Sequence, residues 1–213
     1  MKTDRREVFR YLGYGAHEAD EATRHLAEEC ILELEDCVRP RFLVKEFPLR
    51  LAGGGRIDAG AFVTESRNLE KNLSGCEKIL LMAATLGAEA DRLLFRYGKL
   101  RVARAAVMQA AAAAMTEAWC NEINGIWKEQ YEKEGWFLRP RFSPGYGDFS
   151  LSCQKHILDG LEAGKRIGIT LTEGGLMMPS KSVTAVIGAG REPCRCVLEG
   201  CEACSRTECA FRR

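Results

Sequence analysis

The sequence predicts an α+β fold in which a twisted, largely antiparallel sheet is flanked by helices, one of them long. Three observations lead to this prediction. Residues 77–86 form a continuous apolar run, which is typical of a central strand. Residues 100–134 carry apolar side chains at approximately helical spacing over a much longer stretch. Helix-like and strand-like segments also follow one another without a regular strand–helix–strand rhythm, which favours antiparallel over parallel pairing.

The N-terminal part predicts two helices. A short helix is expected over residues 4–12, ended by Gly13. A second helix is expected over residues 17–38, because its apolar side chains share one stripe and its charged side chains lie elsewhere. The stripe consists of Ala19, Ala22, Leu26, Cys30, Ile31, Leu34 and Val38.

A strand and a turn follow. Residues 41–51 predict a strand that Pro48 confines to a sheet edge or interrupts, because proline donates no backbone hydrogen bond. The three glycines at 53–55 predict a turn, and they are not followed by the Lys-Ser/Thr pair of a phosphate-binding loop. A short helix is expected within residues 62–74, before the central strand.

Beyond the central strand, a helix is expected over residues 87–97, ended by Gly98, and the long helix follows it. Residues 136–142 predict a strand. A helix capped by Ser150 or Ser152 should then run to about residue 163.

Two further strands are expected near the C-terminus, at residues 166–172 and 182–188. After Gly190 the composition becomes charged, cysteine-rich and poor in core residues. We therefore expect one domain over residues 1–190 and a Cys-rich appendage over residues 191–213.

Composition limits the possible partners. The chain has 213 residues, with 31 basic and 30 acidic side chains and a net charge of +1. This balance gives no electrostatic case for binding nucleic acid or an anionic membrane. The charged N-terminus does not resemble a signal peptide, and no apolar run approaches the roughly 20 residues that a membrane span needs. A cytoplasmic protein is expected.

Five of the ten cysteines lie in the last 20 residues, with the spacing C-x-C-x4-C-x2-C-x4-C. Without a secretion signal, metal binding is a better interpretation than disulfides. Thiolates from a tight turn converge on one metal ion, and both zinc and an iron–sulfur cluster accept four of them. Redox-active thiols or disorder are the alternatives. The candidate ligands are Cys201, Cys204, Cys209 and, as the fourth, Cys194 or Cys196.

Other candidate chemistry is sparse. Cys153 and His156 lie three residues apart, as a nucleophile and its base could on a helix, but no third group orients the histidine. Glu117 and Glu122 lie within the mostly apolar long helix. A carboxylate beside a packed face could receive an ammonium group, although both residues are also compatible with an ordinary solvated stripe.

The densest turn signals lie at residues 138–147, where Arg141 and Tyr146 stand among prolines and glycines. Proline fixes φ and glycine admits positive φ, so a tight exposed loop is expected. A rigid loop that holds a planar cation beside an aromatic ring suits capture of a carboxylate-bearing small molecule. The turn-forming residues are Pro140, Pro144, Gly145 and Gly147.

Two sequence blocks together resemble the reactivation domain of cobalamin-dependent methionine synthase. The first, an arginine followed after three residues by Gly-Tyr, is met from Arg141 to Tyr146. The second is Leu-Thr-Glu, then Met-x-Pro, then Ser-Val, and the order and separation of the blocks also agree. The first 75 residues match only faintly, and the tail has no counterpart. The second block consists of Leu171, Thr172, Glu173, Met177, Pro179, Ser182 and Val183.

The resemblance implies a role in repair: S-adenosylmethionine is positioned over cobalamin while an electron arrives from a redox partner, and the methyl group moves to cobalt. It implies that Arg141 binds the methionyl carboxylate and that Ser143 and Gly145 offer backbone groups. Tyr146 would lie near the sulfonium and the corrin face, as the candidate catalytic residue. Glu117 would contact the ammonium group.

This chain differs from the family pattern at the nucleoside. The family has a Trp-Tyr pair soon after Ser-Val, and Val186 and Ile187 stand there instead, so Ile187 takes a cofactor-contacting position. The chain also lacks an Asp-x-His-x-x-Gly motif, so cobalamin would come on a partner. We expect a reactivation protein for a separate corrinoid methyltransferase such as methionine synthase, as a component of that activity. The tail could bring the electron close to the corrinoid.

Two rivals remain. The first is a non-catalytic module that binds S-adenosylmethionine or a corrinoid protein and uses a zinc-stapled tail for docking. The absent aromatic pair favours it. The second, a methyltransferase acting on its own substrate, is weak, because the sequence shows no Gly-rich nucleotide loop.

Overall fold

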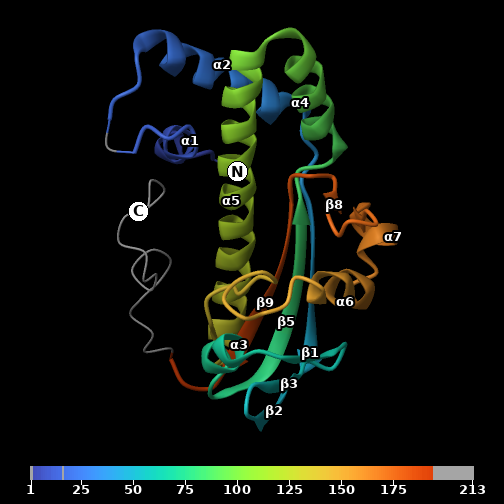
Figure 1. The fold of residues 1–213 in the computed structure, drawn as a ribbon. Coiled ribbons are helices and arrows are strands. Elements are labelled where there is room, and N and C mark those ends of the chain that lie inside the picture. The colour runs from blue at the N-terminus through green and yellow to red at the C-terminus, as the bar shows by residue number, and fades with distance from the viewer. Residues whose placement is uncertain (1, 16, 194–213) are drawn as a thin grey trace.

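The computed structural model describes residues 2–15 and 17–193. A four-stranded antiparallel sheet of order β1-β5-β9-β6 forms its centre, with a three-stranded sheet β2-β3-β4 and a hairpin β7-β8 beside it (Figure 1). The predicted α+β class is confirmed. The helices are α1 (Arg5–Tyr11), α2 (Glu21–Cys37), α3 (Arg67–Asn72), α4 (Ala88–Leu100), α5 (Val102–Lys133), α6 (Cys153–Gly160) and α7 (Ala163–Ile167). The strands are β1 (Arg41–Pro48), β2 (Arg50–Gly53), β3 (Arg56–Asp58), β4 (Val63–Glu65), β5 (Cys76–Thr85), β6 (Phe137–Leu138), β7 (Thr170–Leu171), β8 (Met177–Met178) and β9 (Ser182–Gly190).

Strand β5 is buried on both faces because alternate side chains enter different cores. Ile79, Leu81 and Ala83 pack with α6 and α7 on one face. Leu80 and Met82 pack on the other face, against α5. This double burial explains why the strand has a continuous apolar sequence rather than an alternating one.

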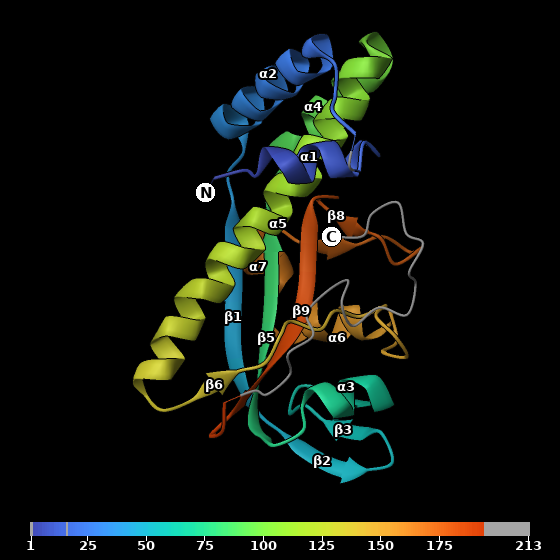
Figure 2. The same ribbon diagram turned by 90° about the vertical axis from the view of Figure 1, so that its left-hand side faces the viewer.

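Helix α5 serves two cores. Its N-terminal half packs against α1, α2 and α4 beyond the end of the sheet, where the alanines at 110–112 allow close approach. Its C-terminal half, with Cys120 and Ile123, covers the sheet. Figure 2 shows the helix running from the helical end of the molecule down across the strands.

The structure corrects two predicted strands. Residues 166–172 do not form one strand: helix α7 continues to Ile167 and is ended by Gly168, whose φ of 75° is left-handed, so only β7 is extended. Residues 136–142 pair with the sheet only in part. Pro140 has no N–H to donate, and the pairing resumes at Phe142, which bridges to Val186.

Several predicted boundaries also move. Helix α2 begins after Asp20, whose carboxylate caps it, rather than at residue 17. The short helix expected within residues 62–74 is confirmed as α3, which Ser66 caps, and residues 63–65 before it form β4. Helix α4 passes through Gly98. Within the described residues, no helix combines the length and the apolar character needed to cross a membrane.

Two glycine substitutions should change stability in opposite directions. A Cβ at Gly188 of β9 would lie 2.6 Å from Cys76 Sγ and 2.7 Å from Leu73 Cδ2. Gly188→Ala should therefore lower the free energy of unfolding by about 1–3 kcal/mol. At Gly125, inside α5, a Cβ would meet nothing within 4 Å, so Gly125→Ala should raise it by about 0.5–1 kcal/mol. Urea denaturation measures both. A Gly188→Ala protein as stable as wild type would contradict this packing.

Candidate functional site

The loop between β6 and α6 folds back on itself. Phe142 and Val186 exchange backbone hydrogen bonds of 2.9 Å in both directions, which ties the loop to β9. The Gly145 N–H donates to the Phe149 carbonyl at 2.8 Å, and the buried Phe149 ring anchors the turn from below. Gly145 has a φ of 94°, a conformation that L side chains rarely adopt, so glycine is required at this turn.

Asp148 fastens the same loop to helix α3. Its carboxylate accepts hydrogen bonds from the Ser66 hydroxyl at 2.5 Å and from the backbone N–H groups of Arg67 at 2.8 Å and Asn68 at 3.1 Å. The Ser66 hydroxyl and these two N–H groups hold the pKa of Asp148 below its usual range. The loop is thereby held at both ends, by β9 and by α3.

Arg141 reaches from the loop to helix α5. Its Nη2 donates to Asn121 Oδ1 at 2.7 Å and lies 3.4 Å from Glu117 Oε2. The Arg141 side chain is 19% exposed and that of Glu117 is 32% exposed. A guanidinium and a carboxylate therefore stand side by side, and both remain accessible to solvent.

Two further side chains lie within electrostatic reach of this ion pair. Burial raises the pKa of Cys120 to about 11, while the positive charge of Arg141 acts in the opposite direction. That thiol is therefore protonated at neutral pH and is a poor nucleophile. Burial also raises the pKa of Tyr11, and the negative charge of Glu117 adds to this effect. Helix α1 thus borders the site.

The structure brings together most of the residues that the sequence singled out. Ser143 and Tyr146 lie in the same turn, where the Tyr146 N–H donates to the Ser143 carbonyl at 3.1 Å. The Tyr146 ring is 57% exposed and stands edge-on to Phe142, with centroids 6.0 Å apart. Ile187 is different: it is 1% exposed, and its side chain packs in the core between the sheet and α5.

Sequence reasoning missed Asn121 and Asp148. Asn121 follows Glu117 by one helical turn, so the spacing placed both on one face of α5 and could have identified it. No sequence pattern near Asp148 indicates its hydrogen-bond partner, because Ser66 lies 82 residues away in the sequence.

The other candidate groups have separate partners. Cys153 is buried, with its Sγ 3.2 Å from Thr64 Oγ1. His156 stacks on Phe62 at a centroid distance of 5.8 Å, so these two side chains have different neighbours. Among the described residues, no group of three or more His, Cys, Asp or Glu side chains could hold a metal ion. The five tail cysteines lie outside the described residues, as does most of the appendage, so both stay predictions.

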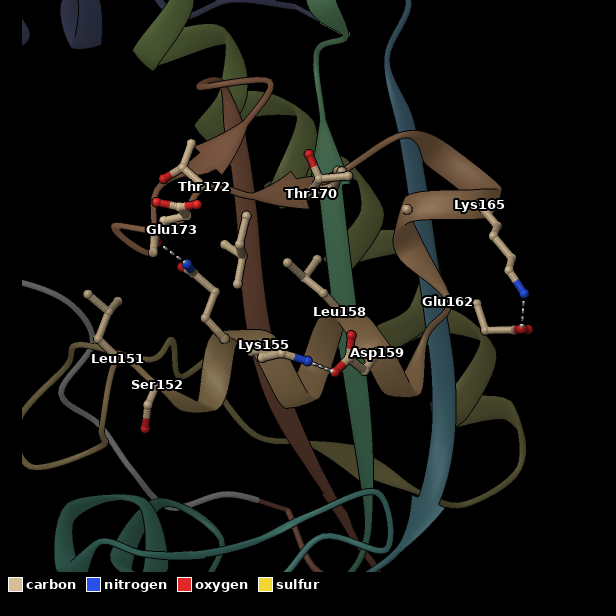
Figure 3. A pocket seen from close by; sticks show the side chains of 15 residues that line it. Leu151, Ser152, Lys155, Leu158, Asp159, Glu162, Lys165, Thr170, Thr172 and Glu173 are labelled. Atoms are coloured by element: carbon tan, nitrogen blue, oxygen red, sulfur yellow. Dashed lines mark hydrogen bonds and ion pairs between the residues drawn. The ribbon is translucent and has the colours of Figure 1, made fainter.

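A groove of about 970 Å³ lies beside the loop, between α6 and residues 169–175. Its floor includes the buried side chains of Leu158 and Ile169. Its charged rim is largely self-paired: Figure 3 shows Lys155 bound to Asp159, at 2.5 Å. Leu151, at one end of the groove, would lie 3.6 Å from a Cβ at Gly145, so the groove adjoins the loop.

The chain is similar in fold, but not closely in sequence, to a protein of known structure. No family model and no curated protein sequence matches the chain. Among solved structures, it is similar to the crystal structure of the MetH reactivation domain bound to AdoHcy, with a TM-score of 0.60 and 18% identity. The similarity covers 87% of this chain and 76% of that one. The chain has the fold of that domain. At this identity the similarity concerns architecture alone, and the ligand belongs to the neighbour.

Removing the Asp148 carboxylate should loosen the loop without unfolding the sheet. Asp148→Ala leaves the Ser66 hydroxyl and two N–H groups of α3 without their acceptor. Hydrogen exchange followed by mass spectrometry should show faster exchange in residues 143–149 and at the start of α3. Asp159→Ala, which removes an exposed carboxylate of α6, is the matched control and should leave exchange in the loop unchanged. Equal loop protection in wild type and Asp148→Ala would show that the clamp does not hold the loop.

Proposed function

We propose that this protein binds S-adenosylmethionine and supports reductive methylation of cob(II)alamin carried by a separate corrinoid methyltransferase, with methionine synthase as the first candidate. Three observations support the proposal. The chain has the fold of a reactivation domain that was crystallised with AdoHcy. It carries the two sequence blocks described above. Its loop also holds Arg141 beside Glu117.

The pairing of Arg141 with Glu117 is the observation that carries the proposal. An α-amino acid presents a carboxylate and an ammonium group on one carbon. A guanidinium and a carboxylate 3.4 Å apart offer each of these groups a partner of opposite charge. Asn121 holds the guanidinium in place through a neutral amide, which does not neutralise its positive charge, so a ligand carboxylate would compete with Glu117 for it.

The remaining loop residues would position the ligand. Ser143 and Gly145 would offer backbone groups other than the Ser143 carbonyl and the Gly145 N–H, which are bonded within the loop. The exposed Tyr146 would lie near the sulfonium and the corrin face of the partner. Since the reactive groups belong to the cofactors, the contribution of the protein is orientation and proximity. The corrinoid protein and a redox partner would supply cobalamin and the electron.

Contacts to the nucleoside part of S-adenosylmethionine have less support than contacts to its amino-acid part. Val186 and Ile187 stand in place of the aromatic pair of the family. Their aliphatic side chains have no ring to stack on, and both are buried. We therefore expect weak binding of S-adenosylmethionine by the isolated protein. The same observation favours the alternative of a non-catalytic binding module. Methylcobalamin formation on a corrinoid protein, with a chemical reductant, would separate the two: the reactivation protein accelerates it, and the module does not.

Arg141→Ala should weaken binding of S-adenosylhomocysteine by roughly 30- to 150-fold, because a bidentate charged partner contributes about 2–3 kcal/mol. Isothermal titration calorimetry measures this. Glu117→Gln should weaken binding of S-adenosylhomocysteine less than Arg141→Ala does, since the substitution removes the charge that faces the ammonium group but keeps the shape of the side chain.

Arg166→Ala is the matched control, because Arg166 is an exposed arginine of α7, away from the loop. It should bind as wild type does. If the ligand binds and Arg141→Ala has unchanged affinity, the carboxylate is held elsewhere and the proposed site is wrong.

A separate prediction concerns the Cys-rich appendage over residues 191–213. Anaerobically purified protein should contain one metal site that depends on Cys201, Cys204 and Cys209, with Cys194 or Cys196 as the fourth ligand. Elemental analysis and ultraviolet–visible and paramagnetic spectra distinguish an iron–sulfur cluster from zinc. A colourless, zinc-loaded protein would exclude an electron-carrying role, and a metal-free protein would exclude the site.

A further inference from the structure

The turn between α4 and α5 exposes an unusual combination of side chains. Residues 92–116 contain five basic residues and no Asp or Glu. Phe95 is 68% exposed, Leu100 69% and Val102 79%. Lys99 lies 4.1 Å from the centroid of the Phe95 ring. We call this surface the basic tip; its charged members are Arg96, Lys99 and Arg101.

The charges of the basic tip have few partners within the chain. Arg92 pairs with Glu89, and Arg104 pairs with Glu29 and Glu33. Arg96, Lys99 and Arg101 form no ion pair with a carboxylate in residues 2–15 and 17–193, although Arg96 interacts with Glu33 at longer range. Cations in the last turn of α4 complement the helix dipole, but this does not require exposed phenylalanine, leucine and valine beside them.

Helix α2 carries the complementary surface. Leu32 is 58% exposed, and its four neighbours one turn away are all acidic. We call this surface the acidic face; it consists of Leu32, Glu28, Glu29, Glu35 and Asp36.

The negative charges of Glu35 and Asp36 are electrostatically unfavourable at the C-terminal end of α2. They lie in the last turn of α2, which has no basic residue, so they face the negative end of the helix dipole. Neither forms an ion pair in the described part of the chain, whereas Glu28 is held by Arg5, which interacts with Glu35 only at longer range. Two exposed carboxylates that lower the stability of their own helix, and that form no close ion pair among the described residues, indicate a partner outside the chain.

We propose that the protein forms a two-fold symmetric dimer in which the basic tip of each copy lies on the acidic face of the other. A second copy is the occupant that the charges favour, because the chain carries both complementary surfaces, each with an apolar centre and a charged surround. Both surfaces lie at the helical end of the molecule, in α2 and at the α4–α5 turn (Figures 1 and 2). The Arg141 loop and α6 lie away from that end, so the dimer leaves the loop accessible.

Sedimentation velocity of the full chain tests the association. At 50 mM NaCl and micromolar concentration a dimer should form, and 500 mM NaCl should weaken it on the order of tenfold or more, because exposed charges are screened. Phe95→Ser should also shift the equilibrium toward monomer. Leu176→Ser, which removes a comparably exposed leucine outside both surfaces, should not.

Charge exchange tests the pairing itself. A tip variant, Lys99→Glu with Arg101→Glu, and a face variant, Glu35→Lys with Asp36→Lys, should each be monomeric alone, since like charges then meet at both contacts. An equimolar mixture should form a heterodimer, because each reversed tip meets a reversed face and each native tip meets a native face. Lys155→Glu with Lys165→Glu makes the same net change at α6 and α7 and should dimerise as wild type does.

The face variant should also melt slightly higher than wild type as a monomer, since its lysines favour the end of the helix dipole. This distinguishes loss of association from loss of folding. A wild-type protein that stays monomeric at 100 µM and 50 mM NaCl would overturn the proposal and leave the basic tip to a different acidic protein. So would a dimer whose two charge variants fail to associate when mixed. Neither result tests the site at Arg141, so a failure of the dimer proposal leaves the proposed function untouched.

Discussion

The structure depends on one helix that belongs to two cores. At 1.5 Å per residue, the 32 residues of α5 span about 48 Å, more than any other element. Met115 is buried in the helical core and Cys120 in the core against the sheet. Glu117 lies between them, where the helix passes from one core to the other and its outer side is left partly open. Because both neighbouring turns are fixed by packing, the carboxylate that faces Arg141 is held on a rigid element rather than on a second loop.

The relative strengths of the interactions explain how such a pair can remain ready for a ligand. An ion pair between partly exposed side chains contributes no more than about 1 kcal/mol, because solvent screens it. A bidentate contact between an arginine and a ligand carboxylate is stronger, about 2–3 kcal/mol. Under the proposed function, exchanging the Glu117 contact for a ligand carboxylate would therefore be favourable. The hydrogen bond from Arg141 to Asn121 and the attachment of the loop through Asp148 already order the loop before any ligand binds, and this would limit the entropy lost on binding.

The parts of the fold that sequence reasoning predicted are those with strong local patterns. The ten residues of β5 and the length of α5 follow from hydrophobic periodicity, and the Pro-Gly loop follows from turn chemistry. The predicted strand over residues 166–172 is wrong. Its alternation of aliphatic with small or hydroxyl side chains is typical of strands, whereas Gly168 and the packing of Ile167 select a helical turn. The clamp at Asp148 could not be predicted, since it joins segments that only tertiary folding brings together. The loop of the candidate site could therefore be predicted from the sequence, whereas the Asp148 contacts that hold the loop could not.

The burial of Val186 and Ile187 links the stability of the sheet to ligand recognition. They are adjacent residues of β9, and their side chains enter the two cores on opposite faces. Fully burying an aliphatic side chain contributes about 1.5–3 kcal/mol, so this pair stabilises the inner strand from both sides. An aromatic pair that reached a bound nucleoside would give up part of that burial to the ligand. Under the proposed function, recognition by this chain would rest on the amino-acid end of the ligand, at Arg141 and Glu117. Enclosure of the nucleoside would then depend on a surface supplied by the proposed partner.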